Sequence, residues 1–193
     1  MPHGSFSSLS HAKLPFGKQE EKTRMETLQF IRSAVDAVNG MVGTAMNDLT
    51  DEVINWHPGG TANTIAQLLA HMVTGQDLLV NDKLVPGGGK TLHESGWAER
   101  TGIPLDRSQI WQRDAWRLNL AAFDDFRLEV AAGAVRRLET TMAADLDRQA
   151  SWIRGPDRPV ALMWQTIFVN HGFGHCGEIS AIKGMQGLKG LPI

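Results

Sequence analysis

Two histidines near the C-terminal end have the spacing of a metal-binding pair. His171 and His175 stand four residues apart, inside a segment whose apolar residues recur at helical intervals. Residues four apart on a helix lie on the same face, one turn above the other. Two imidazoles at this spacing can share one metal ion, as they do in helical zinc sites. Alone the pair is weak evidence, because this spacing arises by chance in many helices.

A third histidine strengthens the metal hypothesis. His71 lies in the strongly apolar helical segment 64–73. Three neutral imidazoles leave one coordination position for water or substrate, which is typical of a catalytic rather than a structural zinc site. The alternative is that each histidine is a hydrogen-bonded residue of the core. We predict that His71, His171 and His175 are the metal ligands, provided that their two helices face each other.

Glu178 is the candidate catalytic residue. It follows His175 by three positions and His171 by seven, so all three side chains share a helix face. Three roles fit this spacing: a general base, a carboxylate that orients a ligand histidine, or a solvated side chain. The spacing does not choose among them.

Other reactive residues have weaker patterns. Cys176 is about 100° around the helix from His175, so we expect a small buried residue rather than a ligand. His57 and His93 fall in loops and stay unassigned. The connection over residues 86–107 is long for a helical domain, and long ordered loops are often functional. Within it, Trp97 fits either the wall of a substrate pocket or an anchor for the loop.

The residues that must position the histidines form four amphipathic segments. No stretch alternates with period two for long enough to predict a strand, so the fold class is all-α. Thr64 and Gln67 fit a capping box at the start of the second segment. The pattern predicts a four-helix bundle, in which metal sites are built from facing helices. The predicted segments are residues 25–49, 64–85, 108–142, which a break around 117–120 could interrupt, and 160–183.

Length and composition fit one globular domain. The chain has 193 residues, of which 42% are hydrophobic and 21% are charged. Residues 1–23 show no helical period, so we expect a flexible N-terminal tail followed by a bundle domain over residues 24–193.

Charge and cysteine content limit the partners. A formal net charge of −2 gives no polycationic surface, so we expect no nucleic-acid partner. The apolar runs are too short to span a membrane, and no signal-peptide core is apparent. The single cysteine fits a reducing cytoplasm, which is the expected location. A small molecule is the expected partner, and apolar bundle faces also allow a homodimer.

The sequence resembles the DinB/YfiT-like superfamily over roughly residues 25–193. The resemblance rests on the segment 63–71 with His71, on the pair His171 and His175, and on the glycine-rich segment 177–192. It implies a four-helix bundle with up-down-down-up connectivity. It also implies that these three histidines bind the metal, as the corresponding histidines do in the superfamily.

The resemblance implies a chemistry as well. Enzymes of the superfamily include mycothiol-dependent maleylpyruvate isomerase and bacillithiol transferases, which use a divalent metal with a thiol cofactor. The expected cofactors are therefore a divalent metal ion, zinc or nickel, and a low-molecular-weight thiol. The leading interpretation is a metal-dependent transferase or isomerase. The alternatives are a non-catalytic, stress-associated metal-binding bundle and a metal-dependent hydrolase.

Overall fold

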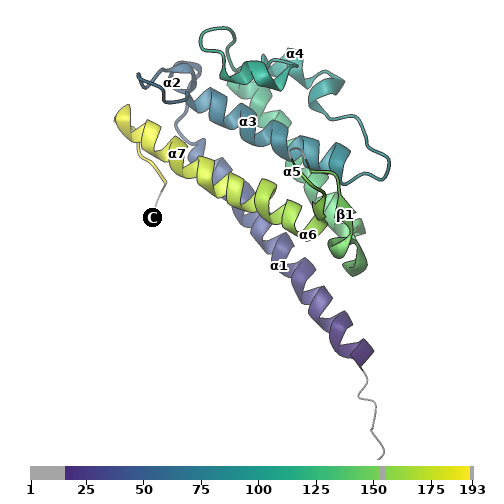
Figure 1. Cartoon of the computed structure of the whole chain (residues 1–193). Helices are drawn as coiled ribbons and strands as arrows, with labels where there is room; N and C mark the ends of the chain where they lie inside the picture. Colours follow the sequence, from purple (N-terminus) through teal and green to yellow (C-terminus); the bar gives the residue numbers. More distant parts are fainter. Residues whose placement is uncertain (1–15, 153–154, 192–193) are drawn as a thin grey trace, which may run out of the picture.

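The computed structural model describes residues 16–152 and 155–191, with side chains from Thr27 onward. The described chain is mostly helical, which confirms the all-α expectation (Figure 1). No helix in these residues is both long and apolar enough to cross a membrane. The α-helices are α1 (Phe16–Ala45), α2 (Asp51–Asn55), α3 (Ile65–Leu78), α4 (Trp97–Thr101), α5 (Leu120–Thr140), α6 (Val160–Met163) and α7 (His171–Met185).

Short helical turns and one small hairpin complete the fold. The turns η1 (Leu79–Lys83) and η5 (Trp164–Asn170) are π-helical, whereas η2 (His93–Ser95), η3 (Arg107–Trp111) and η4 (Ala143–Asp147) are 3₁₀-helical. Strands β1 (Gln149–Ala150) and β2 (Arg158–Pro159) pair antiparallel, with Gln149 opposite Pro159. The hairpin is too short to have shown an alternating pattern in the sequence.

Four long helices pack side by side. Helix α1 contacts α5 and α7, and α3 contacts the same two helices. Figure 1 shows α7 running alongside α3 and against α1. The pairing places α3 next to α7, which is the condition that the predicted metal site required. The up-down-down-up connectivity stays a prediction.

Two apolar clusters form the core. One joins α3 to α5 and α7, and the other joins α1 to η1, α6 and η5. Lys183 ties α7 to the end of α1, because its buried ammonium donates to the carbonyls of Ala45 at 3.2 Å and Asn47 at 2.7 Å. A cation that binds the last carbonyls of a helix stabilises its C-terminus.

The first helix begins earlier than expected. Helix α1 starts at Phe16, so residues 16–23 are helical although their sequence shows no helical period. The division into a flexible tail over residues 1–23 and a bundle domain over 24–193 stays a prediction. The segment 18–22 reads Lys-Gln-Glu-Glu-Lys, which are all good helix formers but carry no apolar stripe. Periodicity therefore could not detect it. The rest of the expected tail, residues 1–15, lies outside the described residues.

The third predicted helix is split. A 3₁₀ turn at Arg107–Trp111 and an extended connection precede α5, which begins only at Leu120. Asn119 caps this start, because its side chain accepts a hydrogen bond from the Ala122 amide at 3.2 Å. By contrast, the capping box at the start of α3 is confirmed, with Thr64 and Gln67 bonding each other's backbone amides.

Candidate metal centre

The structure brings the three predicted histidines together. One ring nitrogen from each of His71, His171 and His175 lies within 4.8 Å of the other two. The ring centroids are 4.5 Å apart for His171 and His175, and 4.7 and 5.3 Å from His71 to these two. Among the described residues, this is the group of histidine, cysteine and acidic side chains that could hold a metal ion.

Two helices position the cluster, and they lie close together at a glycine. His71 is on α3, and the other two histidines form the first turn of α7. A Cβ added at Gly75, one turn after His71, would lie 3.6 Å from Cε1 of His171. This is an ordinary contact distance, so the His171 ring lies close to the α3 backbone at Gly75 with room for no more than a methyl group between them.

Glu178 orients one of the imidazoles. Its carboxylate accepts a hydrogen bond from Nδ1 of His175 at 3.0 Å. A carboxylate is an acceptor, so this bond keeps the proton on Nδ1 and leaves the Nε2 lone pair free to bind a cation. Histidines that bind metals commonly donate their second nitrogen in this way. The Glu178 side chain is 55% exposed.

The electrostatics keep His171 neutral. Burial lowers the pKa of His171 to about 4, with His175 and His71 contributing in the same direction. Nδ1 of His171 is buried and has no hydrogen-bond partner of good geometry in the described structure. The Ile167 carbonyl raises the pKa of His171, but less than burial lowers it. A neutral imidazole is the protonation state that a metal ion requires. The donor set of the cluster therefore fits a divalent ion such as zinc or nickel.

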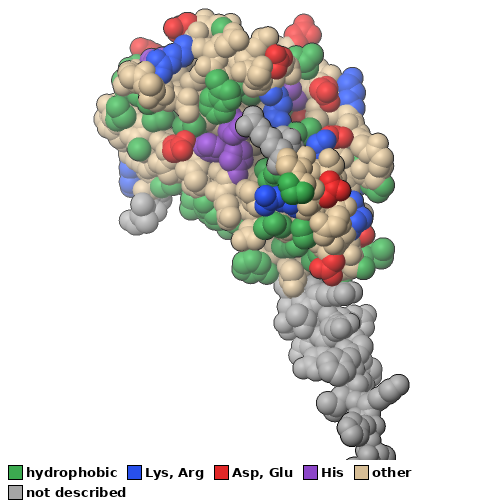
Figure 2. Space-filling model, in the orientation of Figure 1, with side chains coloured by type: hydrophobic (Ala, Val, Ile, Leu, Met, Phe, Trp, Pro, Cys, Tyr) green, Lys and Arg blue, Asp and Glu red, His purple; other side chains and the backbone are tan. Residues whose placement is uncertain are grey.

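A cavity adjoins the cluster. Its volume is about 510 Å³, within the range of small-molecule sites. In Figure 2, histidine side chains form a patch near the middle of the face shown, beside hydrophobic and basic side chains. Eight residues line the cavity: His71, Gly75, Arg107, Ser108, Trp111, Trp152, Ile167 and His171.

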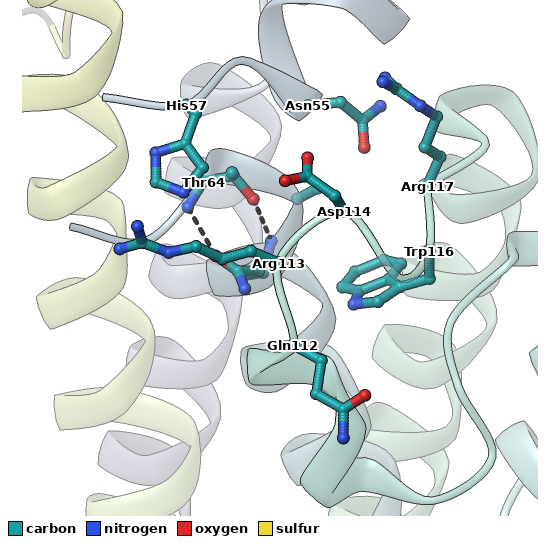
Figure 3. Close-up of a pocket in the computed structure, with 10 residues that line it drawn as sticks. Asn55, His57, Thr64, Gln112, Arg113, Asp114, Trp116 and Arg117 are labelled. Atoms are coloured by element: carbon teal, nitrogen blue, oxygen red, sulfur yellow. Dashed lines mark hydrogen bonds between the residues drawn. The ribbon is translucent and has the colours of Figure 1, made fainter. Parts of the chain in front are cut away.

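The loop histidines do not join the cluster. His93 is buried and its Nε2 donates to the Pro104 carbonyl at 3.0 Å. His57 lines a separate hollow at the start of α3, between the preceding loop and the segment 112–117 (Figure 3). That hollow measures about 30 Å³, which is room for about one water molecule and not for a substrate.

Cys176 and Trp97 are buried core residues and not part of the candidate site. Cys176 is fully buried in the core, and burial raises the pKa of its thiol to about 11, so it is neither ligand nor nucleophile. Trp97 is also buried, and its ring lies 5.5 Å from that of Phe126. It anchors the long connection to α5 and is not among the residues that line the cavity beside the histidines.

Sequence reasoning missed three side chains of this cavity. Arg107 and Trp111 belong to the turn η3, and Trp152 follows the strand β1. No local pattern marks them, because they come from connections that only the packed helices bring together. The length of the segment 86–107 was a signal for Arg107 alone.

The fold and the site together define a class: a helical protein with a three-histidine cluster that could bind a metal ion next to an open cavity. The family model of the DinB superfamily matches residues 19–179, and the chain belongs to this superfamily. No curated protein sequence matches the chain.

Proposed function

We propose that this protein is a divalent-metal enzyme, a transferase or isomerase that acts on a small molecule with a low-molecular-weight thiol. The observation that carries the proposal is that two of the three clustered histidines, His71 and His171, line a cavity of about 510 Å³. A metal that only tied two helices together would need no adjoining space, whereas a catalytic site keeps a position open to substrate.

Each side chain has a part in this proposal. His71, His171 and His175 would hold the ion through one nitrogen each, and Glu178 would fix the tautomer of His175. A bound divalent ion supplies positive charge that stabilises a thiolate or polarises a carbonyl oxygen. Ligands on one zinc ion lie about 3.3 Å apart, so the imidazoles would draw together by small side-chain rotations.

Orientation would supply most of the rate. Lowering the pKa of a thiol from about 8.5 to about 6.5 raises the thiolate fraction at pH 7 from about 3% to about 75%. The nucleophilicity falls by about eightfold at a Brønsted slope of about 0.45, which leaves a net gain of about threefold. The cavity walls would therefore have to align the thiol and the electrophile, an effect that can reach effective molarities of ~10⁵ M.

The other readings have less support. A hydrolase would need a general base facing the substrate, but Glu178 bonds His175 and is not among the residues that line the cavity. A structural metal site would not require the adjoining cavity. The cytoplasmic location, the homodimer and the absence of a nucleic-acid partner stay predictions.

Metal content is the first test. We expect the purified full chain to contain about one zinc or nickel ion per chain, and His171→Ala and His175→Ala to lose most of it. His57→Ala should retain it, because His57 lies at the separate hollow. Equal metal content in all these proteins would overturn the ligand assignment. A screen of thiols against electrophiles with the metal-loaded protein then tests the reaction, and no turnover with any pair would favour the non-catalytic bundle.

A further inference from the structure

One residue that lines the cavity is a cation, and the acidic side chain nearest to it in effect lies outside the cavity lining. Arg107 is the single arginine or lysine among the eight residues that line the cavity, and none of them is acidic. Asp77 is the acidic side chain that acts on the Arg107 guanidinium. Its oxygens already accept hydrogen bonds from Asn81 and from the amides of Leu92 and His93.

The guanidinium is held by one edge and free at the other. Nε of Arg107 donates to Oγ1 of Thr74 at 3.0 Å, and this hydroxyl donates to the Ala70 carbonyl at 2.7 Å. Within the described part of the chain, no hydrogen bond or ion pair is formed by the two terminal amino groups of Arg107. Arg127, by contrast, pairs its Nη2 with Asp124. A pair of parallel N–H groups is the geometry that binds a carboxylate through both oxygens.

The free edge faces the histidine cluster. A Cβ placed on Gly75 would lie 3.5 Å from Nη2 of Arg107 and 3.6 Å from Cε1 of His171. The arginine and the histidine therefore border the same small space beside Gly75. Burial lowers the pKa of the Arg107 guanidinium, so a bound anion would relieve an electrostatic cost.

Two tryptophans supply apolar surface around this space. Trp111 packs against His71 with ring centroids 4.8 Å apart, and its side chain is partly exposed. Trp152 lies under the Arg158 guanidinium at 5.1 Å, which holds the ring in place. Large flat rings next to a fixed cation suit a ligand with an apolar or aromatic body and one anionic group.

We propose that Arg107 binds the carboxylate of an organic substrate whose body packs on Trp111 and Trp152 and whose reactive part reaches the three histidines. The proposal rests on the proposed function and names its substrate class, a small monocarboxylate with an apolar body. Arg107 would set specificity and orientation, because a fixed charge beside the histidines defines which part of the ligand meets them.

Benzoate and benzamide provide a matched pair of probes. They share shape and ring but differ in charge, and their binding is measured by calorimetry with the full chain, both zinc-loaded and treated with a chelator. We expect saturable binding of benzoate, and binding of benzamide weaker by roughly tenfold or more. The preference for benzoate over benzamide should persist without metal, because it comes from the Arg107 guanidinium.

Arginine variants locate the binding. Arg107→Gln should reduce benzoate affinity to that of benzamide, and Arg107→Lys should fall between, because lysine keeps the charge but loses the paired donors. Arg113→Gln is the control, since Arg113 is exposed, lines the separate hollow and bonds the Ala62 carbonyl. It should bind benzoate like the wild type. Circular dichroism checks that every variant is folded.

Distinct outcomes separate this inference from the proposed function. Benzoate binding that depends on Arg107, in a protein that takes up no metal even when zinc is supplied, would support the inference and contradict the enzyme proposal. Benzoate binding only with zinc and independent of Arg107 would place the carboxylate at the histidines and overturn the inference. Equal affinity for benzoate and benzamide, or no saturable benzoate binding to the wild type, would overturn it as well.

Discussion

The Glu178–His175 hydrogen bond gives the two ring nitrogens of His175 different roles. The carboxylate holds the proton at Nδ1, so Nε2 is the atom available to a metal ion. The sequence spacing had left three roles open for Glu178. The contact favours the role in which Glu178 orients a ligand.

Glu178→Gln tests that role. The amide keeps the shape of the side chain but removes the negative charge that favours the Nδ1–H tautomer, so we expect metal affinity to fall by about 10–100-fold. Metal affinity is measured by competition with a chelator of known strength. Glu129→Gln is a matched control, because Glu129 is exposed on α5. Unchanged affinity with activity reduced by about 10²–10⁴-fold would instead make Glu178 a general base.

His93 should give the folded protein a pH dependence unrelated to the metal. Its Nε2 donates to the Pro104 carbonyl, and its Nδ1 is buried without a partner in the described structure. Burial lowers the pKa of His93 below the ordinary 6.5. The unfolded chain then binds the proton more readily, so the free energy of unfolding should decrease as the pH falls below about 6.5.

His93→Leu removes this titration. Urea unfolding at several pH values between 7.5 and 4.5 measures the effect as the difference in slope between wild type and variant. The variant should lose less stability than the wild type over this interval. Parallel curves for the two proteins would show that His93 does not contribute.

At the scale of the elements, the contact between α1 and α7 depends on a residue without a side chain. A Cβ at Gly172 would lie 2.5 Å from Cγ1 of Val38, which is closer than real atoms approach. The glycine weakens the helix itself, but it lets the two helices pack closely next to the histidines.

Alanine substitutions at two glycines of α7 should have opposite effects. Gly172→Ala should reduce the free energy of unfolding by about 1–2 kcal/mol, because overpacking outweighs the gain in helix propensity. Gly177→Ala should raise it by about 0.5–1 kcal/mol, because nothing lies within 4 Å of the added methyl group. Chemical denaturation measures both. A stabilised Gly172→Ala protein would mean that α1 and α7 separate without cost.

The helices that pack along an apolar stripe were predictable, and the others were not. The stripes predicted α3, the main part of α1 and a last helix over residues 160–183 because burial repeats with the helical period. The polar start of α1 has no stripe. The break before α5 depends on Asn119 and on the Leu120 amide bonding Asp51, which lies 69 residues earlier in the chain. Periodicity carries no information about such a contact.

The same distinction applies to the site. The three histidines were predictable because two share a helix face and the third lies in a second apolar helix. Arg107 was not, because its place beside His171 depends on Thr74, on the open space at Gly75 and on the path of a long connection. Cavities form between elements, whereas sequence patterns describe elements one at a time.

For the whole molecule, a metal ion held by α3 and α7 would stabilise the folded state by mass action. At a free zinc concentration 1,000 times the dissociation constant, the added stability is about 4 kcal/mol. For a chain of this size, that corresponds to a rise in Tm of roughly 8–16 °C. Thermal unfolding with zinc and with a chelator measures the shift. His171→Ala should unfold at nearly the same temperature in both conditions, and an equal shift in that variant would place the stabilising metal elsewhere.

The π-helical turn Trp164–Asn170 lets the last helical run hold about one residue more than an α-helix would over the same rotation. Before this turn, Val160 and Met163 face one apolar cluster, and after it Cys176 and Ile179 face the other. Because i→i+5 hydrogen bonds take up the additional residue, deletion of one residue within the turn would leave an ordinary α-helix whose two halves keep nearly the same relative orientation. By contrast, deletion of Gly174 in the regular helix α7 would rotate His175 by about 100° relative to His171. The first shortened protein should keep its metal content and the second should lose it, with similar helix content by circular dichroism in both.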